Sequence, residues 1–191
     1  TSSLVGSEMC IRDRIDLTED ANVTDGVYTI NIAEDYKFTC KKSPETSNRI
    51  VVDGTNTSEQ DNINIYLNKV NINTSTGPAL RINVNVKATV TIYLTGTNNL
   101  IAKNTWYAGL QKANTASLII TTKVLDTTAG ILNAHGSSDG DGAGIGGGFY
   151  GSVSCSNIII DSCSVIASSK YGAGIGGNKQ GAGSNITINS A

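Results

Sequence analysis

Two carboxylates in one glycine-rich loop are the side chains of this 191-residue chain best suited to hold a metal ion. Asp139 and Asp141 lie in the segment Gly136–Gly142, where two acids and the loop carbonyls could bind Ca²⁺ weakly. An Asp-Gly turn without any ion is the alternative, because the corresponding loop Ser168–Tyr171 has no acid. We therefore expect no cofactor, with calcium at Asp139 and Asp141 as the one candidate.

Acid–base catalysis has few candidates in the same region. Inverting hydrolysis of a polysaccharide needs two carboxylates about 6.5–9.5 Å apart. Of the four acids beyond residue 61, only Asp139 and Asp141 are close in sequence; the others are Asp126 and Asp161. His135 is the single histidine, and a hydroxyl nucleophile with an imidazole base would have to use it. The sequence predicts a non-catalytic protein, with a pectin-type lyase or hydrolase as the enzymatic alternative.

Aromatic residues gather next to the glycine-rich segments and form the candidate ligand-binding set. In a stack of equivalent coils, Tyr107 and Tyr171 would share one edge. Aromatic rings can stack on the apolar faces of sugars or on a partner protein. The alternative is that they only cover the corners of the coils. The candidate glycan-binding residues are Trp106, Tyr107, Phe149, Tyr150 and Tyr171.

A glycine motif occurs twice and organises the second half of the chain. Gly142–Gly148 reads GAGIGGG, and Gly172–Gly177 repeats GAGIGG thirty residues later. Dinucleotide-binding glycine motifs are followed by a helix whose N-terminus holds the phosphate. No helical period follows either copy here. The motif therefore predicts a tight coil corner, in which Ile145 and Ile175 point inward.

Short apolar runs recur with the same period. Leu80, Leu110, Ile145 and Ile175 are spaced by 30, 35 and 30 residues, and three strand-like runs fall within each period. This pattern predicts an all-β, right-handed parallel β-helix with about three strands and about 30 residues per coil. A β-sandwich of antiparallel hairpins is the alternative. We expect N-terminal strands and cap-like first coils over residues 15–60, and repeating coils over residues 61–191.

Bulk composition excludes two classes of partner. Charged residues make up only 16% of the chain, the net charge is −2, and the basic residues are scattered, so no nucleic-acid surface is expected. No apolar run approaches the roughly 18 residues that a membrane-spanning helix needs.

Cys155 and Cys163 flank one predicted strand and are too far apart for a disulfide.

The two ends of the sequence carry expectations of their own. Residues 4–14 resemble the translation of a transposase adapter used in sequencing libraries, so residues 1–14 are interpreted as an artefact or a disordered leader. The sequence stops within a repeat, which predicts a fragment truncated at its C-terminus. Its exposed strand edges would promote aggregation, whereas the full-length protein is expected to be monomeric.

Several segments together resemble a known group of proteins. They are Gly26–Ile30, Ile63–Ile72, Leu94–Leu100, Ala108–Gln111 and the two GAGIGG repeats. This succession is similar to bacterial cell-surface β-helix proteins common in gut Firmicutes, described as carbohydrate-binding-domain or adhesin-like. The resemblance implies an extracellular module that binds a polysaccharide or a host or cell-surface glycan. A passive stalk of a larger surface protein is the alternative.

Overall fold

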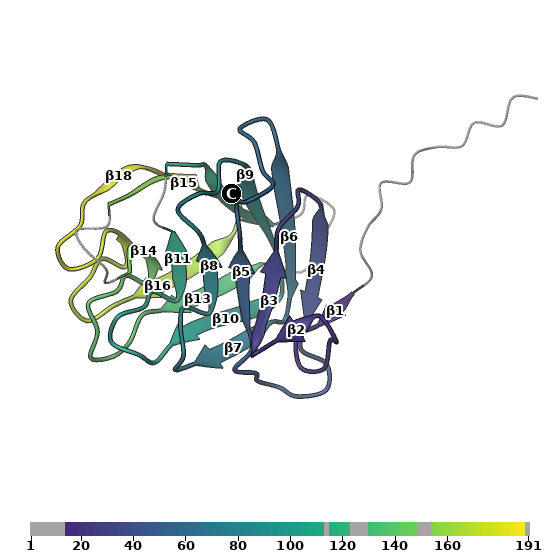
Figure 1. Ribbon diagram of the computed structural model, residues 1–191. Coiled ribbons are helices and arrows are strands. Elements are labelled where there is room, and N and C mark those ends of the chain that lie inside the picture. Colours follow the sequence, from purple (N-terminus) through teal and green to yellow (C-terminus); the bar gives the residue numbers. More distant parts are fainter. Residues whose placement is uncertain (1–13, 113–114, 123–129, 149–153, 190–191) are drawn as a thin grey trace, which may run out of the picture.

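The computed structural model describes residues 14–112, 115–122, 130–148 and 154–189, and these residues form a stack of coils (Figure 1). Each regular coil contributes one strand to each of three sheets. Sheet A contains, in spatial order, β1 (Ile15–Asp16), β4 (Asp35–Thr39), β6 (Asn62–Asn68), β9 (Thr89–Thr95), β12 (Leu118–Thr122), β15 (Cys155–Asp161) and β18 (Gly183–Asn189). Sheet B contains β2 (Val23–Thr24), β3 (Val27–Ile30), β5 (Arg49–Val52), β8 (Leu80–Ile82), β11 (Leu110–Lys112), β14 (Ile145–Gly146) and β17 (Ile175–Gly176). Sheet C contains β7 (Asn71–Thr74), β10 (Thr97–Ala102), β13 (Ile131–His135) and β16 (Ser164–Ser168).

The strand pairing confirms the predicted parallel β-helix. Leu110 pairs with Leu80 on one side and Ile145 on the other, and Ile145 pairs in turn with Ile175. The stack has about five turns of roughly 29 residues. Neighbouring coils pair in parallel, which excludes the β-sandwich of antiparallel hairpins. Residues 15–60 already supply β1 to β5, so sheets A and B begin before residue 61.

Alternating apolar residues produce the core, because successive side chains of a strand point to opposite faces of its sheet. In β6 the residues Ile63, Ile65 and Leu67 are fully buried, while the residues between them face outward. The register continues these positions from coil to coil, so Ile65 pairs with Ile92 and Ile92 with Ile120. Inward isoleucine, leucine and valine side chains therefore form rows along the axis of the stack.

Glycine is required at the corner that follows each GAGI segment. Gly146 and Gly176 pair across neighbouring coils and have φ angles of 131° and 138°. A Cβ atom on Gly146 would also overlap the carbonyl oxygen of Gly176. The corner therefore needs glycine for both its backbone conformation and its close approach to the next coil. Ile145 is fully buried beside it, as the sequence predicts.

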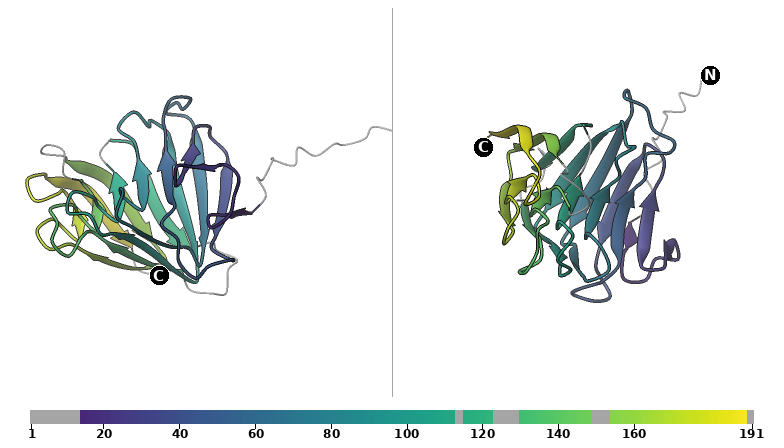
Figure 2. Two further views of the ribbon diagram at one scale, coloured as in Figure 1. Left: turned by 60° about the horizontal axis from the view of Figure 1, so that its bottom comes forward. Right: turned by 60° about the vertical axis from the view of Figure 1, so that its left-hand side comes forward.

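The two ends of the stack differ in construction (Figure 2). At the N-terminal end, β2 pairs antiparallel with β3 through a turn at Asp25 and Gly26, and so covers the outer edge of sheet B. At the other end, β16, β17 and β18 are the outermost strands of their sheets among the residues described.

Two polar side chains are buried inside this framework. Asn98 accepts a hydrogen bond from the backbone N–H of Val70 at 2.9 Å and donates one to the Gly96 carbonyl at 3.1 Å. Lys112 is fully buried, and its ammonium group donates to the Ser156 carbonyl at 2.7 Å. Burial lowers the pKa of Lys112 to about 8, against a smaller opposing effect of the neighbouring Cys155.

The described residues contain strands and turns but no helix, so none of them forms a helix that could cross a membrane. Cys40, Cys155 and Cys163 are free thiols, in agreement with the prediction that Cys155 and Cys163 do not pair.

Candidate functional site

Three of the predicted aromatic and acidic residues lie in one row at the corner between sheets C and B. The register places Trp106, Asp141 and Tyr171 at equivalent positions, each four residues before a paired residue of sheet B. Two backbone hydrogen bonds confirm the alignment at this corner: Asp141 N–H donates to the Thr105 carbonyl, and Tyr171 N–H to the Gly140 carbonyl. We call Trp106, Asp141 and Tyr171 the corner row.

Both aromatic members of the corner row are accessible. Trp106 is 41% exposed and Tyr171 is 52% exposed. They lie on coils separated by one intervening coil, so their backbones are about 9.6 Å apart along the axis at about 4.8 Å per coil. Apolar rings exposed in this way offer two platforms in line, with the Asp141 carboxylate between them.

Lysine side chains surround the tyrosine of the corner row. The ammonium groups of Lys170 and Lys179 lie 5.2 Å and 5.1 Å from the centre of the Tyr171 ring. The same lysines pair with the two predicted calcium ligands, Lys170 with Asp139 at 3.3 Å and Lys179 with Asp141 at 3.5 Å. The hydrogen bond to Asp139 is the largest cause that raises the pKa of Lys170, followed by its interaction with Tyr171.

These ion pairs involve both carboxylates of the predicted calcium site. Each carboxylate already has a cationic partner; the Lys170–Asp139 pair is exposed, whereas the Asp141 side chain is only 21% exposed. Nowhere in the described ranges do three or more histidine, cysteine, aspartate or glutamate residues cluster as a metal site would require. The arrangement is that of two lysine–carboxylate pairs that fix the loops around Tyr171.

Tyr107 is not equivalent to Tyr171, contrary to the sequence prediction, but lies one residue further along its coil. The register aligns Tyr107 with Gly142 and Gly172, and it is Trp106 that shares a row with Tyr171. Tyr107 is half-buried and interacts electrostatically with Arg49. Burial lowers the pKa of the Arg49 guanidinium, and the interaction with Tyr107 acts in the opposite direction. Phe149 and Tyr150 lie outside the described residues.

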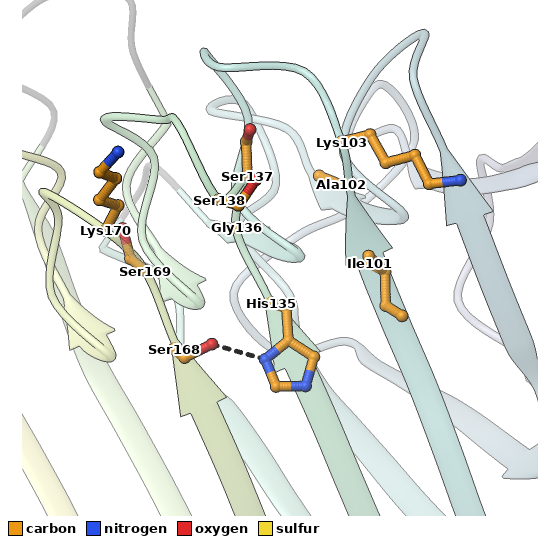
Figure 3. A pocket seen from close by; sticks show the side chains of 10 residues that line it. All are labelled: Ile101, Ala102, Lys103, His135, Gly136, Ser137, Ser138, Ser168, Ser169 and Lys170. Carbon is orange, nitrogen blue, oxygen red and sulfur yellow. Dashed lines mark hydrogen bonds between the residues drawn. The ribbon is translucent and has the colours of Figure 1, made fainter.

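A groove of about 730 Å³ opens beside the corner row, where β10, β13 and β16 end (Figure 3). His135 and Ser168 are paired neighbours in sheet C, and His135 Nδ1 lies 2.6 Å from Ser168 Oγ. Among the residues that the structure describes, the remaining lining carries hydroxyl, ammonium and apolar groups and no carboxylate: Ile101, Ala102, Lys103, Gly136, Ser137, Ser138, Ser169 and Lys170. Lys170 thus belongs both to the groove and to the surroundings of Tyr171.

Neither the groove nor a second aromatic feature, on sheet A, is predicted by the sequence patterns. On the outer face of sheet A, the rings of Tyr66 and Tyr93 stack with their centres 4.7 Å apart, and the Tyr66 hydroxyl donates to Asp35 at 3.2 Å. Burial, with Asp35 as the next cause, raises the pKa of Tyr66 to about 12. The alternation of apolar and polar residues in β6 and β9 could have predicted the tyrosine pair, because it places both tyrosines on the outward face of the sheet.

Comparisons with known proteins do not assign this arrangement, because no protein-family model, no curated protein and no solved structure matches the chain.

Proposed function

We propose that this chain is a non-catalytic, extracellular module of a bacterial cell-surface protein that binds glycans at the corner row and the adjoining groove. The observation that carries the proposal is the alignment of Trp106 and Tyr171, two exposed rings in one row along the axis. A sugar chain lying along that axis would stack on both rings, since the apolar faces of sugars pack on aromatic side chains.

The groove supplies the polar half of such a site. Sugar hydroxyls are both donors and acceptors, and serine hydroxyls and lysine ammonium groups can satisfy them. Ser137, Ser138 and Ser169 lie along the path that leads from the end of sheet C toward Tyr171. Ligand sites of this kind combine an apolar surface with a few polar groups that fix orientation.

The same geometry supports a binding role over a hydrolytic one. His135 and Ser168 form a base–hydroxyl pair, but none of the described residues that line the groove supplies a carboxylate to orient the imidazole. Asp139 and Asp141, the close pair of acids in the described coils beyond residue 61, are each held by a lysine. We therefore assign His135 to ligand contact.

A glycan array probed with the purified protein, with and without a chelator, tests the proposal. We expect binding that is lost when Trp106→Ala and Tyr171→Ala are combined, while the melting temperature stays unchanged because both rings are exposed. Tyr93→Ala is the matched control, since it removes an aromatic ring from sheet A and leaves the corner row intact. Calcium independence is expected from the lysine pairing of Asp139 and Asp141.

A passive stalk is the alternative, and one feature of the outer surface favours it. Asn133 donates a hydrogen bond to Asn99 of the neighbouring coil at 2.8 Å, and Asn73 donates one to Glu45 at 3.0 Å. Such contacts stiffen the stack without forming a ligand site. Absence of any glycan signal, or binding that survives the double substitution, would reject the proposed site and favour the stalk.

A further inference from the structure

Two arginine side chains lie on adjacent strands at the outer face of sheet B. In β5 the residues Ile50 and Val52 point into the core, so Arg49 and Val51 face outward. Val51 pairs with Arg81 of β8, which also faces outward and is exposed. Since β5 and β8 are neighbours in the sheet, Arg49 and Arg81 are diagonal neighbours on one surface (Figure 1).

The guanidinium group of Arg49 occupies a space that a glycine leaves open. Gly77 lies at the corner before β8, and a Cβ atom there would overlap Nη1 of Arg49. The register of β8 and β11 makes Gly77 equivalent to Tyr107, because each lies three residues before a paired leucine. The guanidinium group therefore lies over the corner of one coil and interacts electrostatically with the tyrosine of the next.

Neither arginine has an acidic partner in the part of the chain that the structure describes. The Nε atom of Arg49 is buried without a hydrogen-bond partner there, and the ion pairs between described residues use lysines and neither arginine. Asp53, the acid that follows β5, accepts hydrogen bonds from Thr55 at 2.8 Å and from Asn85 at 3.3 Å instead. Two neighbouring positive charges therefore remain uncompensated by the described carboxylates.

These two charges disfavour each other, and an oxyanion would favour both. Burial is the largest cause that lowers the pKa of Arg49; Tyr107 acts in the opposite direction, and Arg81 lowers the pKa further. A partly buried charge costs free energy unless it is paired. Guanidinium groups present parallel N–H donors that match the oxygen atoms of a carboxylate or sulfate group. An oxyanion between the two arginines would therefore offset both the burial and the repulsion.

The arginine pair lies beside the proposed glycan site. Tyr107 directly follows Trp106 in the chain, so Arg49 is close to the first ring of the corner row. Gly77 belongs to the coil before Trp106, whereas Asp141 belongs to the coil after it. A sugar on the Gly77 side of Trp106 therefore meets positive charge, on the side away from the Asp141 carboxylate.

We propose that Arg49 and Arg81 bind the carboxylate or sulfate group of an acidic sugar, so that the glycan at the corner row is anionic. This proposal rests on the proposed function, because the rings of Trp106 and Tyr171 hold the rest of the glycan. The acidic sugar lies on the Gly77 side of Trp106, and each guanidinium group donates hydrogen bonds to its oxyanion. A neutral sugar at that position gains no such contact.

An array that carries oligogalacturonates, sulfated galactans and the methyl-esterified or desulfated form of each tests this proposal. The wild type should bind an acidic glycan at least about tenfold more tightly than its neutral form, because hydrogen bonds to charged groups are among the strong ones. Arg49→Gln and Arg81→Gln should each remove this preference. Arg49→Lys should also lose most of it, since an ammonium group keeps the charge and lacks the planar pair of donors.

Lys87→Gln is the matched control, because it removes a positive charge from an exposed position between β8 and β9. It should keep the preference for acidic glycans. The two glutamine variants should keep the wild-type melting temperature, since Arg81 is exposed and Arg49 makes no ion pair with a described residue. Inorganic sulfate has the charge without the sugar, and it should bind at least about tenfold more weakly than the acidic glycan.

The outcomes separate this proposal from the proposed function. Equal binding of acidic and neutral glycans, a preference that survives both arginine substitutions, or inorganic sulfate that binds as tightly as the acidic glycan would each overturn the arginine site. If Trp106→Ala with Tyr171→Ala still abolished binding in those cases, the proposed function would stand. Acidic glycan binding that needs the arginines and not the two rings would instead reject the glycan site at the corner row.

Discussion

Replacement of the buried Lys112 by methionine gives a sharp test of the interior described above. The side chain is fully buried and its pKa falls from an ordinary 10.5 to about 8, chiefly because burial disfavours the charged form. Since each pKa unit corresponds to about 1.4 kcal/mol, the charged form costs the folded state about 3 kcal/mol near pH 7. Lys112→Met removes this cost, and it also leaves the Ser156 carbonyl without its 2.7 Å donor.

The pH dependence of the unfolding free energy separates the cost of burying the lysine charge from the cost of losing the hydrogen bond to Ser156. Below about pH 8 the lysine is protonated in both the folded and the unfolded state, so the full cost is present. Between about pH 8 and about pH 10.5 the unfolded state binds more protons than the folded state, and the stability of the wild type therefore rises with pH. The methionine variant lacks this rise. Its stability relative to the wild type should fall by about 2 kcal/mol from about pH 7 to about pH 9.5.

Urea unfolding at the two pH values measures this difference, with the fluorescence of the single tryptophan, Trp106, as the signal. Burial raises the pKa of Cys155, so its thiol contributes stability that is lost as pH rises above about 9. The comparison is therefore repeated in a Cys155→Ala background. Lys87→Met, at an exposed lysine, is the control. A stability difference between Lys112→Met and wild type that stays constant with pH would refute the reasoning.

Three further tests, each made by substitution, examine other parts of the structure. Gly146→Ala should destabilise the fold by at least about 2 kcal/mol in urea unfolding, because it adds a clash to the strained φ angle. Gly26→Ala should cost only about 1 kcal/mol, since its φ is also positive but the nearest atom lies 3.5 Å away; equal costs would contradict this account. Asn98→Leu should cost about 1–3 kcal/mol by leaving the Val70 N–H unpaired, and a neutral effect would count against that bond. A double-mutant cycle of Tyr66→Ala and Tyr93→Ala should give a coupling energy of about 0.5–1.5 kcal/mol, and a value near zero would show that the rings do not interact.

The strand register could be predicted from sequence because a parallel stack requires the same type of residue at the same place in every coil. Leu80, Leu110, Ile145 and Ile175 satisfy this requirement and proved to be paired. The corners could be placed less accurately. Proximity to the glycine motif predicts that Tyr107 aligns with Tyr171, whereas the backbone hydrogen bonds align Trp106 with Tyr171 through Asp141.

The groove could not be predicted because its parts come from three different coils. His135 and Ser168 are 33 residues apart, and they meet only because Ile131 pairs with Ser164 at the start of the same two strands. In the sequence, His135 is an isolated histidine beside Gly136, with no serine partner nearby that the pattern singles out. Once the register is known, the alternation of β13 and β16 places both side chains on the outer face.

The spacing between coils is not constant along the chain. Leu118 and Ile158 pair although they are 40 residues apart, whereas the next pair, Ile158 and Ile186, is separated by 28. The strands keep their pairing while the connecting segments change length. Insertions at the corners therefore leave the core rows intact. The length and composition of the connecting loops can therefore change the outer surface of the stack without altering the side-chain rows that stabilise its core.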